Sequence, residues 1–150
     1  MKSKQLFDLS KITIFTDGGA RGNPGPAAIG VIVENPSTLL KAREYGEYIG
    51  EKTNNQAEYE AVIFALKKVK QLVGKKKTKE AEVEIRMDSE LVARQLNGEY
   101  KIKELELQPL FLKAWNLRLD FKKIIFRYIP REENRRADKI VNEVLDKHKK

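Results

Sequence analysis

The chain has 150 residues, of which 41% are hydrophobic and 35% are charged, a composition typical of one folded domain. It has no cysteine and one histidine, which excludes disulfides, thiolate sites and a histidine zinc site, so a bound metal would need oxygen ligands. Lys and Arg total 30 against 22 Asp and Glu, and this net charge of +8 favours polyanionic partners, although basic surfaces also serve solubility alone. No apolar run approaches the roughly 20 residues of a membrane helix and no signal peptide is evident, so we expect a cytoplasmic protein that does not enter membranes.

The first half of the chain predicts three strands and a helix. Residues 11 to 17 alternate and are rich in β-branched side chains, which predicts a strand ending at Asp17. Strands over 27 to 34 and 40 to 49 follow after turn-forming segments, and together the three favour an antiparallel meander. From residue 55 to 73 the apolar side chains recur with helical spacing, and Gly74 with Lys75 to Lys77, a solvated turn, ends this helix.

The second half alternates strands with helices. Residues 82 to 87 predict a fourth strand that stops at Asp88, and Ser89 is placed to cap a helix running to about residue 96. A helix over about 110 to 117 precedes a fifth strand over 123 to 128, and a last helix begins near Asn134. Phe111 and Trp115 share the helical spacing of the leucines, which favours the core over base stacking.

This order predicts an α/β fold with a mixed five-stranded sheet flanked by helices, in which strands one to three are antiparallel and strands four and five are parallel to the first. We expect one domain over residues 11 to 147. An N-terminal extension of residues 1 to 10 precedes it, and a charged tail of residues 148 to 150 follows.

Four acids lie where predicted strands end or predicted helices begin, and these are Asp17, Glu58, Asp88 and Asp138. If the first and fourth strands are parallel neighbours, Asp17 and Asp88 come within about 5 Å of each other. Carboxylates so close repel one another unless a hard cation binds, which predicts Mg²⁺, with Mn²⁺ as a substitute. Two ions about 4 Å apart suit phosphodiester hydrolysis. Taken singly, each acid also has a structural explanation as a turn, capping or first-turn residue.

Four motifs surround these acids: TDGGARGNPG at residues 16 to 25, TNNQAEY at 53 to 59, MDSE at 87 to 90 and PREENRRAD at 130 to 138. In this order they resemble the type I ribonuclease H family, and the resemblance extends from about residue 12 to 145. It implies that the four acids are the catalytic metal ligands of an endonuclease with two Mg²⁺ ions. The expected reaction is hydrolysis of the RNA strand of RNA/DNA hybrids, giving 5′-phosphate and 3′-hydroxyl ends, by a protein that we expect to be a monomer.

Substrate contacts are expected from short polar residues and exposed backbone near the acids, because the 2′-hydroxyl is recognised through the minor groove. The resemblance assigns Asn23, Asn54 and Gln56 to that groove. The full set of expected substrate-binding residues is Gly18, Gly19, Arg21, Asn23, Asn54, Asn55, Gln56, Ser89 and Asn134. Alternatively, Asn23 forms only a turn, and Asn54 or Asn55 only caps the helix.

Two departures from many bacterial members point to an archaeal-like branch. The loop before Asp138 lacks the histidine that those members assign to proton transfer or product release, and Arg131 is the candidate for that role. A guanidinium cannot act as a general base, and Arg131 is equally well explained as a solvated loop residue. Glu132 or Glu133 is an alternative. The long basic handle is also missing, since only residues 97 to 103 separate the middle helices. Hybrid affinity would then depend on Arg21, Lys101, Lys103, Arg135 and Arg136; alternatively, the protein binds hybrids weakly.

Two other functions share these residues. A hybrid-binding protein with a decayed nuclease would keep the binding groups without turnover, but none of the four acids is lost. A nuclease acting on DNA junctions or transposon ends would share the metal chemistry, but the amides at residues 23 and 54 to 56 favour reading of a 2′-hydroxyl.

Overall fold

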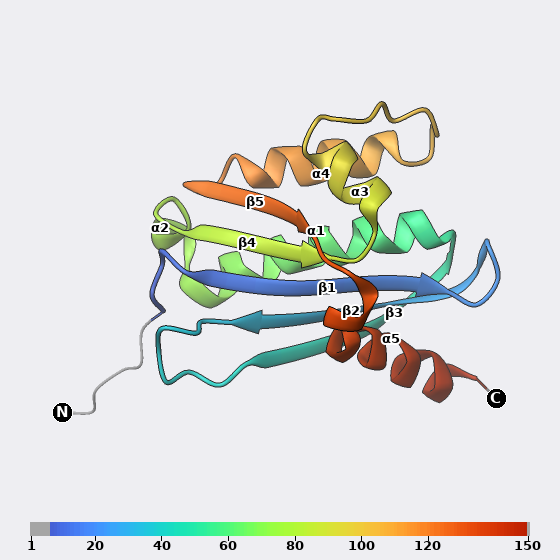
Figure 1. Ribbon diagram of the computed structural model, residues 1–150, viewed down its shortest axis with the longest axis horizontal. Helices are drawn as coiled ribbons and strands as arrows, with labels where there is room; N and C mark the ends of the chain where they lie inside the picture. Colours follow the sequence, from blue (N-terminus) through green and yellow to red (C-terminus); the bar gives the residue numbers. More distant parts are fainter. Residues whose placement is uncertain (1–6, 150) are drawn as a thin grey trace.

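The computed structural model, which describes residues 7–149, contains one five-stranded sheet with the strand order β3-β2-β1-β4-β5 (Figure 1). The first three strands form an antiparallel meander, and β4 and β5 run parallel to β1, as the sequence predicts. The strands are β1 (Ile12–Ala20), β2 (Gly25–Glu34), β3 (Arg43–Lys52), β4 (Glu82–Met87) and β5 (Lys123–Tyr128). The helices are α1 (Asn54–Val73), α2 (Lys75–Thr78), α3 (Glu90–Leu96), α4 (Gln108–Arg118) and α5 (Arg135–His148), with a 3-10 turn η1 (Arg131–Glu133) before α5.

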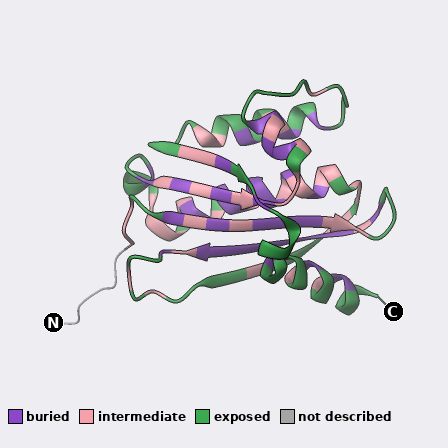
Figure 2. Ribbon diagram, in the orientation of Figure 1, coloured by how far each residue is buried: buried purple, intermediate pink, exposed green. Residues whose placement is uncertain are grey.

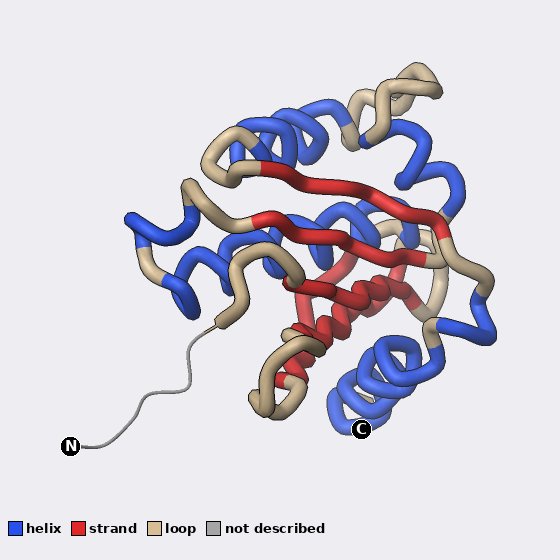
Figure 3. The backbone as a smooth tube through the Cα atoms, turned by 60° about the vertical axis from the view of Figure 1, so that its left-hand side comes forward, coloured by secondary structure: helices blue, strands red, loops and turns tan. Residues whose placement is uncertain are grey.

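The helices form two unequal layers on the sheet. The main core lies between the sheet and the layer of α1 and α4, and it takes in alternate side chains of β1, such as Ile12 and Ile14. On the opposite face α5 packs over β2 and β3, where Ala28 meets Val141 and Leu145. Figure 3 shows the helices on both sides of the strands. The edge strands β3 and β5 are more exposed than the three central strands (Figure 2).

Helix α1 begins at a capping box. The Thr53 hydroxyl accepts the Gln56 N–H at 3.1 Å, and the Gln56 side chain accepts the Thr53 N–H at 2.8 Å. The cap is therefore Thr53, and the alternative that Asn54 or Asn55 caps this helix is wrong. Because Thr53 and Gln56 satisfy the first turn, the Asn54 side chain is left available for the neighbouring strand.

Two glycines let the helices that carry Glu58 and Asp138 approach the sheet closely. A Cβ on Gly18 would overlap the carbonyl group of Ala57, so β1 and α1 meet backbone to backbone. A Cβ on Gly30 would overlap the Ala137 carbonyl oxygen in the same way, on the opposite face of the sheet. The residues after Ala57 and Ala137 are Glu58 and Asp138, so these close approaches bring both acids to the sheet from opposite sides.

The structure moves several boundaries. Strand β1 continues through Asp17 to Ala20, because β2 pairs with it along that whole length. Strand β3 covers Arg43–Lys52 instead of residues 40 to 49, and Lys75 to Lys77 form an exposed helical turn. Phe7 and Leu9 of the expected N-terminal extension pack against the core, and α5 reaches His148 in the expected tail. Residues 1 to 6 and 150 of those two segments lie outside the described residues.

The expectation that Trp115 belongs to the core is wrong. Its side chain is 37% exposed, it stacks on Phe111, and the Arg118 guanidinium lies 3.7 Å from its ring centroid. Leu110 and Ala114 are the buried residues of α4, so Trp115 falls at the edge of that contact while Phe111 is partly buried. Among the described residues, no helix is both long enough and apolar enough to cross a membrane.

Candidate active site

The site forms where β4 stops short of β1. The last residue of β4, Met87, pairs with Thr16, so Asp17 is the first residue of β1 without a partner on β4. In the space beyond Met87 the Glu58 carboxylate accepts the N–H of Gly18 at 3.2 Å. An acid from the α1 face thereby reaches the sheet beside Asp17, and Asp88 follows directly at the end of β4.

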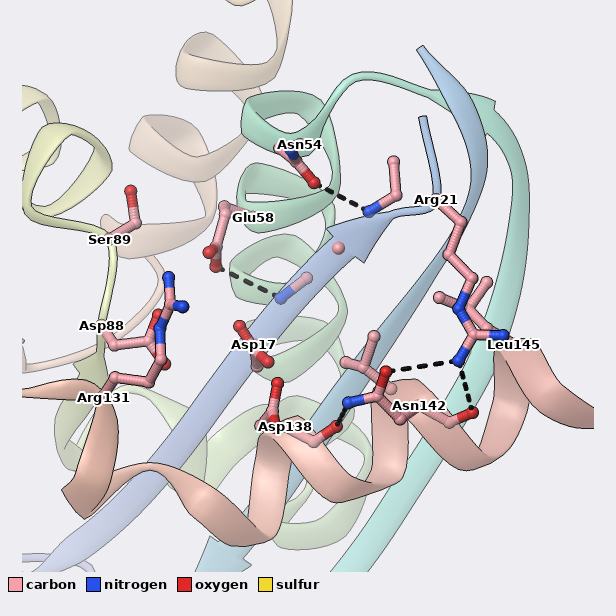
Figure 4. A pocket seen from close by; sticks show the side chains of 14 residues that line it. Asp17, Arg21, Asn54, Glu58, Asp88, Ser89, Arg131, Asp138, Asn142 and Leu145 are labelled. Carbon is pink, nitrogen blue, oxygen red and sulfur yellow. Dashed lines mark hydrogen bonds between the residues drawn. The ribbon is translucent and has the colours of Figure 1, made fainter. Parts of the chain in front are cut away.

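Three of the four predicted acids form a tight cluster. Asp17, Glu58 and Asp88 each offer a carboxylate oxygen, and these oxygens lie within 4.8 Å of one another. Asp138, in the first turn of α5, is not a member of this cluster but lines the same cleft and faces Asp17 (Figure 4). The cleft has a volume of about 370 Å³ and opens to solvent. The structure thus brings together all four acids that the sequence singles out.

Burial and the neighbouring carboxylates raise the pKa values of two of the acids, Asp17 and Glu58. Burial, followed by the nearby charges of Asp88 and Asp138, raises the pKa of Asp17 to about 8. Burial, with Asp17 and Asp88 as neighbours, also raises the pKa of Glu58 well above its ordinary value, and the Gly18 N–H and the Arg131 charge only partly oppose this. None of the ion pairs formed within residues 7–149 includes any of the four acids.

This donor set fits a hard divalent cation. It offers only carboxylate oxygens in the described cluster, and their mutual repulsion is relieved when positive charge enters between them. Asp17, Glu58 and Asp88 would hold such an ion directly, and Asp138, which lines the same cleft, would be a further ligand.

The β1–β2 hairpin and the start of α1 form one wall of the cleft. The Asn54 side chain accepts the Ala20 N–H at 2.8 Å, and the Asn54 N–H is donated to the Asn23 side chain at 3.0 Å. Gly18, Gly19, Arg21 and Asn54 line the cleft, whereas Asn23, Asn55 and Gln56 do not. The Asn23 side chain therefore binds the backbone at the start of α1, and the Asn54 side chain binds the backbone at the end of β1. The Gln56 side chain belongs to the capping box.

The opposite wall carries Ser89 and Arg131. Ser89 accepts the Val92 N–H at 3.2 Å and caps α3, as predicted, while it also borders the cleft. The Arg131 side chain extends from η1 toward the acids (Figure 4).

Asn134 differs most from its expected place. It is 1% exposed, so it does not face the cleft, and its side chain donates to the Thr16 carbonyl at 2.8 Å and to Asp88 at 2.9 Å. The expectation that it contacts substrate does not agree with this burial.

Sequence reasoning missed the part of the cleft formed by α5. Val141, Asn142 and Leu145 line it, and Asn142 accepts the Arg21 guanidinium at 3.3 Å. Arg21 also forms an ion pair with Asp146 at 2.8 Å. Val141, Asn142 and Leu145 follow Asp138 at spacings of three, four and seven. The helical spacing places Val141 and Leu145 in register with that acid, but it did not identify them, or Asn142, as residues of the cleft.

The sheet order and the carboxylate cluster define the class of protein: an α/β protein with a cluster of carboxylates, suited to a hard metal ion, beside the end of β4. Residues 15–144 match the family model described as Reverse transcriptase-like. The LC11-RNase H1 structure, solved in complex with an RNA/DNA hybrid, is 50% identical with a TM-score of 0.84, and the match covers 92% of this chain and 99% of that chain. The chain belongs to the ribonuclease H family.

Two curated relatives are longer proteins. Ribonuclease HI of Halobacterium salinarum is 37% identical over 136 residues, which cover 91% of this chain and 65% of that protein. The bifunctional protein Rv2228c of Mycobacterium tuberculosis is 36% identical over 136 residues, which cover 91% of this chain and 36% of that protein. The chain therefore spans about a third of the mycobacterial relative and less than two thirds of the halobacterial one.

Proposed function

We propose that this protein is a metal-dependent endonuclease that hydrolyses the RNA strand of RNA/DNA hybrids and leaves 5′-phosphate and 3′-hydroxyl ends. The observation that carries the proposal is the meeting of Asp17, Glu58 and Asp88, with oxygens within 4.8 Å, at the end of the central strands. The RNA/DNA hybrid in the LC11-RNase H1 structure supports the choice of substrate. All four acids come from one chain, which supports a monomer, and we retain the cytoplasmic location expected from the sequence.

We assign Mg²⁺ to the site, with Mn²⁺ as a substitute, held by Asp17, Glu58 and Asp88 and completed by Asp138. When bound, the ions would activate the attacking water and neutralise charge on the scissile phosphate and the leaving oxygen. The protein's own groups hold the acids in place: the Gly18 N–H orients Glu58, and Asp17 is buried within β1.

Arg131 is proposed to stabilise negative charge on the phosphate. Its side chain lines the cleft and its charge acts on Glu58. Because a guanidinium stays protonated, it supplies charge and hydrogen bonds and leaves proton abstraction to other groups. The remaining wall, formed by Gly19, Arg21 and Asn54, is proposed to meet the minor groove, where backbone and amide groups can contact the 2′-hydroxyls.

The test compares cleavage of an RNA/DNA hybrid, single-stranded RNA and double-stranded DNA, each with Mg²⁺ or with EDTA. We expect cleavage of the hybrid alone, dependent on the metal, and a near-complete loss of turnover in Asp17→Asn with the fold preserved. Turnover that continues in EDTA would refute the metal site. Tight hybrid binding without cleavage in Mg²⁺ or Mn²⁺ would instead support a binding protein.

A matched substrate separates the DNA-cleaving alternative. When the cleaved ribonucleotides are replaced by 2′-deoxyribonucleotides in the same sequence, the proposed enzyme loses its activity because the 2′-hydroxyl contacts are gone. Equal rates on both substrates would favour a nuclease for DNA.

A further inference from the structure

Asn134 occupies a position where an asparagine ordinarily caps a helix, yet its side chain does something else. It is the residue before α5, and a cap there would accept an N–H of the first turn. No such bond forms. The side chain turns into the protein instead, where it is 1% exposed. The side chain therefore does not cap α5 and instead makes contacts with residues next to the acids.

Those contacts join three elements that carry acids. The Asn134 amide donates to Asp88 at 2.9 Å and to the carbonyl of Thr16, the residue before Asp17, at 2.8 Å. The Asn134 backbone carbonyl accepts the Asp138 N–H at 3.1 Å. One residue therefore links the end of β4, the centre of β1 and the first turn of α5.

The orientation of this amide is fixed by its two acceptors. A carbonyl oxygen in place of the amide nitrogen would face the Thr16 carbonyl and the Asp88 carboxylate, both of which only accept. The Asn134 side-chain oxygen, in turn, is buried and has no partner among residues 7–149. A buried oxygen without a partner is destabilising, so the two hydrogen bonds donated by the Asn134 amide nitrogen are the interactions that hold this side chain in place.

We propose that Asn134 is a positioning residue: it holds one oxygen of Asp88 and sets the spacing between the sheet acids and Asp138, so that the carboxylates are prepared for divalent cations. The inference rests on the proposed metal site, but it concerns a residue that does not touch metal or substrate. Groups that hold metal ligands by hydrogen bonds commonly change metal affinity or activity by about 10- to 100-fold when removed.

The test uses the full chain with Asn134→Ala and Asn134→Ser. Because the Asn134 side chain does not cap α5, neither variant removes a capping bond. Serine can form a helix cap but is too short to reach both acceptors, so a gain in helix capping is separated from the loss of the donors. Asn97→Ala is the matched control, because Asn97 also donates from its side-chain amide to a backbone carbonyl, that of Phe126, at 2.9 Å, and adjoins a helix end away from the acids.

Two measurements are needed. The first is the Mg²⁺ concentration that gives half of the maximal thermal stabilisation, starting from EDTA-treated protein. The second is steady-state cleavage of an RNA/DNA hybrid. In both Asn134 variants we expect the Mg²⁺ midpoint to rise by about 10- to 100-fold and kcat to fall by a similar factor, with KM changed by less than about 2-fold. In Asn97→Ala we expect a lower melting temperature with an unchanged Mg²⁺ midpoint.

An unchanged Mg²⁺ midpoint in both Asn134 variants would overturn the inference and leave Asn134 as a structural residue only. A raised KM at unchanged kcat would overturn it in favour of direct substrate contact. If the wild-type protein cleaves no hybrid at all, the proposed function fails, while the Mg²⁺ midpoints still decide whether Asn134 positions the acids.

Discussion

Replacement of Gly18 by alanine tests how the fold builds the site. Gly18 is buried in β1, and its missing Cβ would overlap the carbonyl group of Ala57 and approach the N–H of Glu58. Both neighbours are backbone atoms in the first turns of α1, so no flexible side chain can move aside. The strand or the helix must shift instead, and the residue that shifts with the helix is Glu58.

The size of the effect follows from this overlap. Carbon and backbone atoms need a separation of roughly 3.5 Å, which requires a movement of about 1 Å between β1 and α1. Overpacking of this kind costs about 1 to 3 kcal/mol of unfolding free energy. For a chain of 150 residues, each kcal/mol corresponds to about 2 to 4 °C, so we expect the melting temperature to fall by roughly 2 to 12 °C. A misplacement of about 1 Å at Glu58 would reduce turnover by up to about 100-fold.

The neighbouring glycine is the control. A Cβ on Gly19 would lie 3.5 Å from Val141, an ordinary contact, so Gly19→Ala should leave stability unchanged or raise it by up to about 1 kcal/mol through the unfolded chain. Thermal unfolding of both variants, with and without Mg²⁺, is the assay. If Gly18→Ala melts like Gly19→Ala and responds equally to Mg²⁺, the close packing of β1 on α1 does not position Glu58, and the reasoning is refuted.

Two further predictions concern charge in the cleft. The pKa of Asp17 is about 8 in the folded protein and near 3.8 in the unfolded chain. Between these values the folded protein binds one more proton than the unfolded chain, so the free energy of unfolding of the metal-free protein should fall as the pH rises from about 4 to 8. Unfolding in EDTA across this range checks it; Asp17→Asn should reduce the slope, and a stability that rises with pH would contradict the assignment. Arg131→Ala should slow hybrid cleavage by about 10- to 100-fold with its melting temperature unchanged, and an unaltered rate would return Arg131 to the role of a solvated loop residue.

The sequence predicted the sheet closely because its local signals agree. Alternation over β1 and β4 and helical spacing over α1 each place apolar residues on one face, and these patterns survive into the core. It failed where a tertiary contact decided the outcome. Strand β1 extends to Ala20 because β2 pairs with it there, and Trp115 lies at the surface because α4 meets only part of its apolar side.

Local sequence determined which residues the site contains. Each acid lies late in a strand, directly after a strand or in an early helical turn, and those positions can be read closely from periodicity and turn residues alone. Only the tertiary structure decided how the acids meet. The last residue of β4 pairs with Thr16, so the space beside Asp17 is open. Gly18 and Gly30 let α1 and α5 approach from opposite faces, and Asn134 turns inward to hold Asp88. The physical reason is that a hydrogen bond between residues 46 positions apart, or a carbonyl group occupying the space of a missing Cβ, leaves no trace in the local pattern of the chain.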